Sequence, residues 1–139
     1  MASSEQTSAL HERYAAWASA RDLSMFRHDA CFRGKLHDVE VVIESSIRDS
    51  GFYDVVLEVA IESGEAPQIL RRGQPPAGEG AHAALHAVLE RHDAITSLRL
   101  EARAVAVRLA PATPPATVET VTAEVIEAVR QSRGAGPYR

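Results

Sequence analysis

Residues 53–62 read YDVVLEVAIE, with apolar side chains at every second position from Val55 to Ile61 and with Glu58 and Glu62 between them. Successive side chains of a β-strand point to opposite faces of the sheet, so this pattern predicts a strand with one buried face and one face in water. Such a strand is typical of an antiparallel sheet. We therefore expect the fold to be built around one.

The sequence on either side of this strand predicts further strands. Residues 26–33 and 39–47 also alternate with a period of two. The GK pair at 34–35 and the DSG triplet at 49–51 are predicted to be the connecting turns. Ile69-Leu70 is expected to form a short edge strand. Turns this short favour antiparallel pairing of successive strands.

A second hairpin is predicted nearer the C-terminus. Leu98 and Leu100 share one parity, and the apolar side chains of 105–109 alternate in the same way. The EAR triplet at 101–103 separates the two segments and is predicted to be their turn. Together with the first group, this hairpin brings the expected sheet to five or six strands.

Three segments have the apolar spacing of an amphipathic helix. They are 8–20, 81–91 and a segment that begins near Thr113-Pro114-Pro115, where a hydroxyl followed by proline is typical of a helix start. The predicted apolar faces are Leu10, Tyr14 and Trp17; Ala81, Leu85, Val88 and Leu89; and Val118, Val121, Val125 and Val129.

We expect a single α+β domain over residues 1–139, with flexible ends at 1–7 and 134–139. Its antiparallel sheet of five to six strands would be packed by three helices in the order α-β-β-β-(β)-α-β-β-α. A chain of 139 residues, 45% of them hydrophobic, is long enough to bury a sizeable core. The loop GQPPAGEG at 73–80 is the strongest break in the chain but is too short to be a domain boundary.

The candidate metal ligands are His82 and His86, which lie one helical turn apart. Zinc needs three or four ligands, and HAALH lacks the glutamate of a zinc-protease helix. We expect both histidines to be half-packed residues at the margin of the helix rather than metal ligands. Cys31 is expected to be a small buried or semi-exposed thiol rather than a nucleophile, because His28 would point to the opposite face of a strand and could not pair with it.

The candidate carboxylates share one parity of the predicted sheet. Four carboxylates on one face would repel one another, and Arg48 is the one cation expected beside them. We therefore expect a solvated outer face or a surface that meets a basic partner. The four are Glu40, Glu44, Glu58 and Glu62.

Other motifs of chemistry are absent from the sequence. It contains no GxSxG elbow, and 73–80 matches neither the Walker pattern nor the dinucleotide fingerprint. The basic clusters, Arg71-Arg72 and Arg99-Arg103-Arg108, are small, and the net charge of −4 argues against a nucleic-acid partner. We accordingly assign no catalytic, cofactor-binding or metal-binding residue.

The predicted order of elements over residues 8–132 resembles that of class I type III secretion chaperones and of the related YbjN-like proteins. The small size and acidic charge are also similar. This resemblance implies a cytoplasmic homodimer that binds a non-globular segment of a partner protein. The sequence departs from those chaperones in its arginine-rich second hairpin and in its proline-rich 73–80 loop, so no binding residue is carried over.

A second resemblance is to a group of uncharacterised bacterial proteins. It rests on 32–61, on ILRRG at 69–73 and on LRLEARAVAVRL at 98–109. This group implies no activity.

The function we expect is that of a non-enzymatic, chaperone-like interaction domain that forms a homodimer in the cytoplasm, with a protein or peptide as a possible further partner. No membrane span is expected, because no apolar run reaches the length of a span. No cofactor is expected either, because the sequence contains no cofactor-binding motif. One alternative is a small-molecule-binding protein or enzyme, with a pocket between sheet and helices lined by Phe26, Phe32 and Trp17. Another alternative is a subunit of a larger assembly.

Overall fold

The structure, a computed structural model, describes residues 12–26, 31–47, 53–64, 66–74 and 80–134. An N-terminal helix is described over 12–20. The other elements are β1 (Ser24–Phe26), β2 (Cys31–Leu36), β3 (Val39–Ile47), β4 (Tyr53–Val59), β5 (Gln68–Leu70), α2 (Ala81–Arg91), β6 (Ile95–Leu100), β7 (Val105–Leu109) and α3 (Pro115–Gly134).

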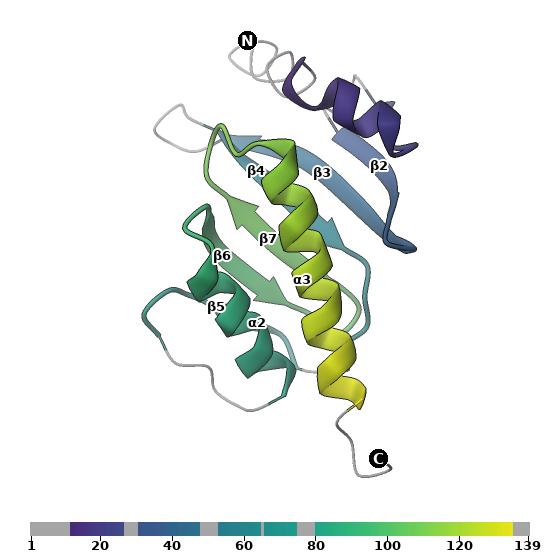
Figure 1. The fold of residues 1–139 in the computed structure, drawn as a ribbon. Helices are drawn as coiled ribbons and strands as arrows, with labels where there is room; N and C mark the ends of the chain where they lie inside the picture. The colour runs from purple at the N-terminus through teal and green to yellow at the C-terminus, as the bar shows by residue number, and fades with distance from the viewer. Residues whose placement is uncertain (1–11, 27–30, 48–52, 65, 75–79, 135–139) are drawn as a thin grey trace.

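The strands form one antiparallel sheet of seven strands in the order β1-β2-β3-β4-β7-β6-β5. The three helices lie on one face of this sheet, with α3 crossing its centre and α2 beside it (Figure 1). The expected α+β class, antiparallel sheet and three helices are confirmed. The sheet has seven strands rather than five or six, because β1 precedes β2 and was not predicted as a separate strand. The strand predicted over 26–33 overlaps both β1 and β2, and its residues 27–30 lie outside the described part of the chain.

The first hairpin turns at a different place from the one predicted. Gly34 and Lys35 lie inside β2, and the turn is formed by His37 and Asp38, with φ angles of 52° and 66°. Two successive residues with positive φ are typical of the type I′ turn, whose twist suits a two-residue hairpin. Gly34 is required for packing instead, since a Cβ there would lie 2.6 Å from Leu23 Cδ2 and 3.1 Å from Leu23 Cα.

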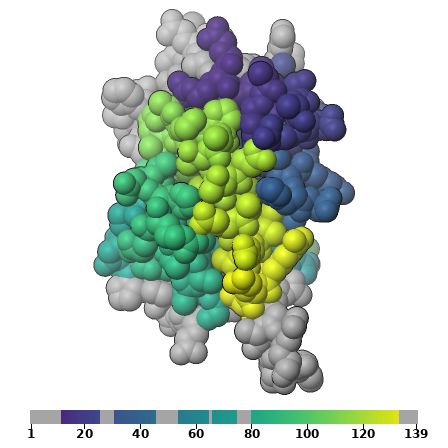
Figure 2. All heavy atoms as spheres, viewed as in Figure 1, coloured from purple at the N-terminus to yellow at the C-terminus, as the bar shows by residue number. Residues whose placement is uncertain are grey.

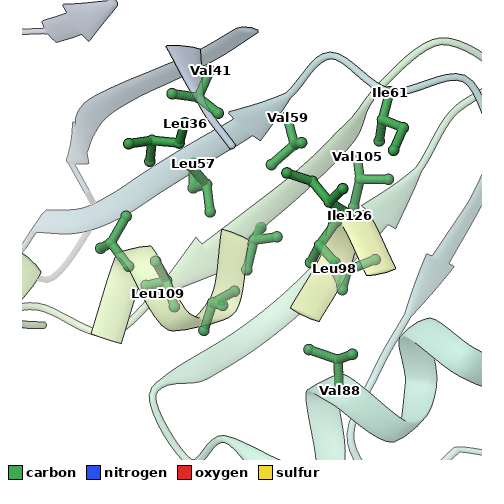
Figure 3. Packing of buried hydrophobic residues seen from close by; sticks show 14 of the residues in the cluster. Leu36, Val41, Leu57, Val59, Ile61, Val88, Leu98, Val105, Leu109 and Ile126 are labelled. Carbon is green, nitrogen blue, oxygen red and sulfur yellow. The ribbon is translucent and has the colours of Figure 1, made fainter. Parts of the chain in front are cut away.

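The core lies between the sheet and the helices. One row of buried side chains runs across six strands, and Ile126 of α3 and Val88 of α2 pack over the sheet (Figure 3). Each fully buried aliphatic side chain contributes about 1.5–3 kcal/mol, so this layer is the main source of stability. The row consists of Phe32, Ile43, Leu57, Val107, Leu98 and Leu70.

The helices bury the faces that the sequence predicts. All four predicted residues of α2 are buried, as are the four valines of α3, and the two helices pack side by side (Figure 2). The prediction that the Thr113 hydroxyl caps α3 is wrong. This hydroxyl donates to the carbonyl of Ala110 at 2.5 Å and so stabilises the turn before the helix. Leu10 lies outside the described residues.

Candidate functional site

The candidate site is the face of the sheet opposite the helices, which we call the open face. Within the described residues, no helix lies on this face (Figure 1). Its side chains come from the strand positions between the buried ones. They include Arg33 and Lys35 of β2; Glu40, Val42 and Glu44 of β3; Val56 and Glu58 of β4; Ala106 and Arg108 of β7; Ser97 and Arg99 of β6; and Ile69 of β5.

Charged and apolar residues alternate across the strands of the open face. The register places Glu58 between Val42 and Ala106, and it places Arg99 between Ala106 and Ile69. In the neighbouring row, Glu44 lies beside Val56, and Arg108 lies on the other side of Val56. Each of these charges therefore has small or apolar cross-strand neighbours, and the face combines apolar surface with charges of both signs.

The centre of the open face is hollowed, with a volume of about 390 Å³. Glu44 and Glu58 line the hollow from one side, and Arg71 and Arg99 line it from the other. Ile69 is 47% exposed at its rim. An apolar side chain of this size in water beside unlike charges is characteristic of a surface that meets another molecule.

An ion pair joins the two halves of the sheet beside this hollow. Arg108 Nη1 of β7 lies 2.9 Å from Asp54 Oδ2 of β4, and the Asp54 side chain is 1% exposed. A buried carboxylate requires a partner, because its desolvation is costly. The pair thus holds Arg108 over the middle of the open face.

The predicted acidic face is found in part. Glu40, Glu44 and Glu58 are exposed on the open face, whereas Glu62 is exposed beyond the end of β4. Arg48 lies outside the described residues. The sequence prediction did not include the arginines of the second hairpin among the neighbours of these carboxylates. These arginines lie beside the carboxylates because β7 pairs with β4, a contact between segments about 50 residues apart. The one sequence signal for them was the position of the arginines between the apolar residues of the predicted hairpin.

The predicted basic clusters have divided roles. Arg72 donates to the carbonyls of His92 and Ile95 at 2.7 and 2.8 Å, and so holds the segment that follows α2. Its neighbour Arg71 lines the hollow, whereas Arg103 lies exposed in the turn between β6 and β7.

The histidines of α2 are half-buried. His86 Nε2 lies 3.3 Å from the carbonyl oxygen of Arg71 and 3.5 Å from Glu90 Oε1. His82 Nε2 is buried and has no hydrogen-bond partner. Among the residues that the structure describes, no three His, Cys, Asp or Glu side chains are grouped so that they could hold a metal ion. Cys31 is a free, buried thiol on β2.

Two carboxylates of α3 attach the other helices to it. Trp17 Nε1 and Arg21 Nε of the N-terminal region donate to Glu119 at 2.9 and 2.6 Å. The Trp17 hydrogen bond, followed by that of Arg21, lowers the pKa of Glu119 below its usual value and outweighs the opposing effect of burial.

Glu124 attaches α2 to α3 in the same way. Arg91 and His92 lie 2.6 and 2.9 Å from its two oxygens. Burial disfavours ionisation of Glu124, but the hydrogen bonds from Arg91 and His92 are stronger together and lower its pKa. Both carboxylates are thus held ionised as structural contacts between helices.

The aromatic residues of the alternative pocket lie in or beside the core. Phe32 is fully buried and stacks with Tyr14 at a ring distance of 6.2 Å. Trp17 packs edge-on against Tyr14 at 5.8 Å, and Arg21 lies over its ring. The side chain of Phe26 is outside the described part of the chain.

Within the described ranges, no helix is both long enough and apolar enough to cross a bilayer. No family model, no curated protein and no solved structure matches the chain.

Proposed function

We propose that the chain is a non-enzymatic protein-interaction domain that acts as a homodimer. The observation that carries this proposal is the open face, where the exposed Ile69 and the half-exposed Val56 lie among charges of both signs. A broad surface that mixes apolar groups with charges of both signs suits a protein partner, because proteins present the same mixture.

The short edge strands of the sheet favour a dimer contact through the open face rather than through strand-to-strand pairing. β1 and β5 are only three residues long. Short edge strands are one means by which proteins prevent strand-to-strand association. Pairing through the open face leaves both edges unchanged.

The positions of the titratable groups also support an interaction role. Glu119, Glu124 and His92 are engaged in contacts that hold the helices together. The order of a helix, a group of strands, a second helix, a hairpin and a third helix is the feature from which we infer a chaperone-like role. A non-globular protein segment is accordingly the further partner that we propose.

Sedimentation velocity of the purified chain at micromolar concentrations tests this proposal. The expected result is a species of twice the 15.0 kDa chain mass that dissociates on dilution. A single species of the chain mass at every concentration would show that the homodimer does not form.

A second candidate function is the binding of a small molecule that carries both charges. The hollow of about 390 Å³ between Glu58 and Arg99 favours it, since small-molecule sites begin at roughly 300 Å³. Thermal unfolding with a panel of amino acids, and with dicarboxylic acids as ligands of one charge only, separates the two candidates. Specific stabilisation that Arg99→Met abolishes would support this second function.

A further inference from the structure

We infer that the open face is the surface through which two copies of this chain pair, with β3 and β4 of one copy over β6 and β7 of the other. This inference rests on the proposed homodimer and goes beyond it by naming the contact surface and the relative orientation of the copies.

The acidic and basic side chains that line the hollow of the open face lie on different strands, while the outer strand β2 adds Arg33 and Lys35 to the same face. Glu44 and Glu58 lie on β3 and β4, whereas Arg99 lies on β6 and Arg71 just after β5. Glu40, by contrast, has Lys35 as its cross-strand neighbour within the same copy. Two acidic and two basic side chains thus remain without a direct cross-strand neighbour of opposite charge, on opposite sides of the β4–β7 junction.

This arrangement is complementary to itself. Two identical faces that pack on each other are related by a twofold axis that lies between them. If the axis runs along the strands between β4 and β7, β3 lies over the partner copy's β6, and β4 lies over its β7. Rotation about this axis keeps the height along the strands, so Glu44 lies over Ser97 of the other copy and Glu58 lies over its Ala106. Arg99 and Arg108 of that copy are each two residues further along the same strands, about 7 Å away and within reach of long side chains.

The other in-plane axis brings like charges together. An axis perpendicular to the strands would place each strand over the same strand of the second copy, so that the acidic sides of the two hollows would meet. Like charges in an interface cost several kcal/mol. The charges therefore select the axis parallel to the strands.

The size and composition of the face are sufficient for a stable pair. Six spacings of about 4.8 Å and strands of roughly 20 Å give a flat area of roughly 600 Å² per copy. Standard interfaces bury roughly 600–1,000 Å² per partner. Val42, Val56, Ala106 and Ile69 supply apolar contact between the charged positions.

A different protein fits this face less well than a second copy does. A partner of uniform charge would be repelled by one side of the hollow. A second copy supplies both charges in the required arrangement, without any further assumption about sequence.

Charge reversal tests the inference. Glu44→Arg with Glu58→Arg replaces the acidic side of the hollow with basic side chains, and Arg71→Glu with Arg99→Glu replaces its basic side with acidic ones. Each double variant alone is expected to dimerise at least about 100-fold more weakly than the unmodified chain, because like charges then meet. An equimolar mixture is expected to recover the association as a heterodimer.

Matched control variants make charge changes of the same number and sign at exposed positions of the helices. They are Glu12→Arg with Glu127→Arg, and Arg13→Glu with Arg130→Glu. These controls are expected to dimerise within a few-fold of the unmodified chain. Circular dichroism and thermal unfolding establish that each variant is folded.

A cross-linking experiment keeps the inference testable if a double variant does not fold. Ala106 lies on β7 next to the proposed axis, and Cys31 is buried. Ala106→Cys is expected to give a covalent dimer with a short bis-maleimide reagent, whereas Ala116→Cys on the exposed surface of α3 is expected to give none.

The outcomes distinguish this inference from the proposed function. If the unmodified chain dimerises and both charge-reversed variants dimerise equally well, the homodimer stands and the open face is not its interface. A mixture that fails to associate also contradicts the inference. If the unmodified chain is a monomer at every concentration, both proposals are wrong.

Discussion

Arg108 Nη1 lies 2.9 Å from Asp54 Oδ2, and this contact joins two strands that are 54 residues apart in the sequence. The Asp54 side chain is 1% exposed, whereas that of Arg108 is 42% exposed. The pair therefore has one buried end and one end on the open face. It couples the stability of the sheet to the surface that we propose as the interface.

Arg108→Met is expected to lower the free energy of unfolding by about 1–3 kcal/mol, because Asp54 stays buried and loses a charged hydrogen-bond donor. The control is Arg99→Met on the neighbouring strand, where no buried carboxylate is involved and a change within about 0.5 kcal/mol is expected. Urea unfolding of dilute protein measures both. Equal stability of the two variants would show that the ion pair contributes little.

Gly34→Ala is expected to destabilise the chain by about 1–3 kcal/mol, because the new Cβ would meet the Leu23 side chain and backbone in a packed region. A double-mutant cycle with Leu23→Ala tests the cause. The cost of Gly34→Ala should fall in the Leu23→Ala background, since the closest atom, Leu23 Cδ2, is then removed. Additive effects would argue against this contact as the cause.

The chain is expected to lose stability in acid through Glu119 and Glu124. Both pKa values are lowered in the folded chain, so the ionised carboxylates stabilise the fold above the unfolded pKa of about 4.3. This contribution is lost as the pH falls through the lower folded pKa values. The free energy of unfolding should therefore decrease below about pH 4.3.

The double variant Glu119→Gln, Glu124→Gln should show a shallower decrease over the same pH range. Glu127→Gln is the control, because Glu127 is exposed and its hydrogen bond is to Gln131 on the same helix. Trp17 is the single tryptophan, and its fluorescence reports the contact with Glu119. An unchanged acid slope in the double variant would exclude these carboxylates as its source.

Tyr14→Phe is expected to lower the free energy of unfolding by about 0.5–1.5 kcal/mol. The Tyr14 hydroxyl donates to the carbonyl of Thr113 at 2.6 Å in a buried position, and the ring itself is retained in the variant. Denaturant unfolding measures the change. A fully stable variant would mean that another donor replaces the hydroxyl.

Local patterns in the sequence predicted the elements that local physics determines. The bounds of α2 and its buried face agree with the prediction, because a 3.6-residue period of apolar side chains marks a helix without reference to the rest of the chain. The strand at Val55–Val59 was equally clear. The boundary between β1 and β2 was missed, because a period of two continues through it.

The open face could be predicted only in part. The parity of Glu44 and Glu58 follows from their own strands, so their shared face was predicted correctly. The arginines opposite them depend on β7 lying beside β4 and β6 beside β7, which is a property of long-range strand order. Residue spacing carries no information about which distant strand becomes the neighbour.

The most direct measurement of the central claim is the mass distribution of the two oppositely charged double variants after mixing. We predict that each variant sediments near the single-chain mass by itself and that the mixture sediments near twice that mass. A mixture that sediments as the simple sum of its separate components would contradict pairing through the open face.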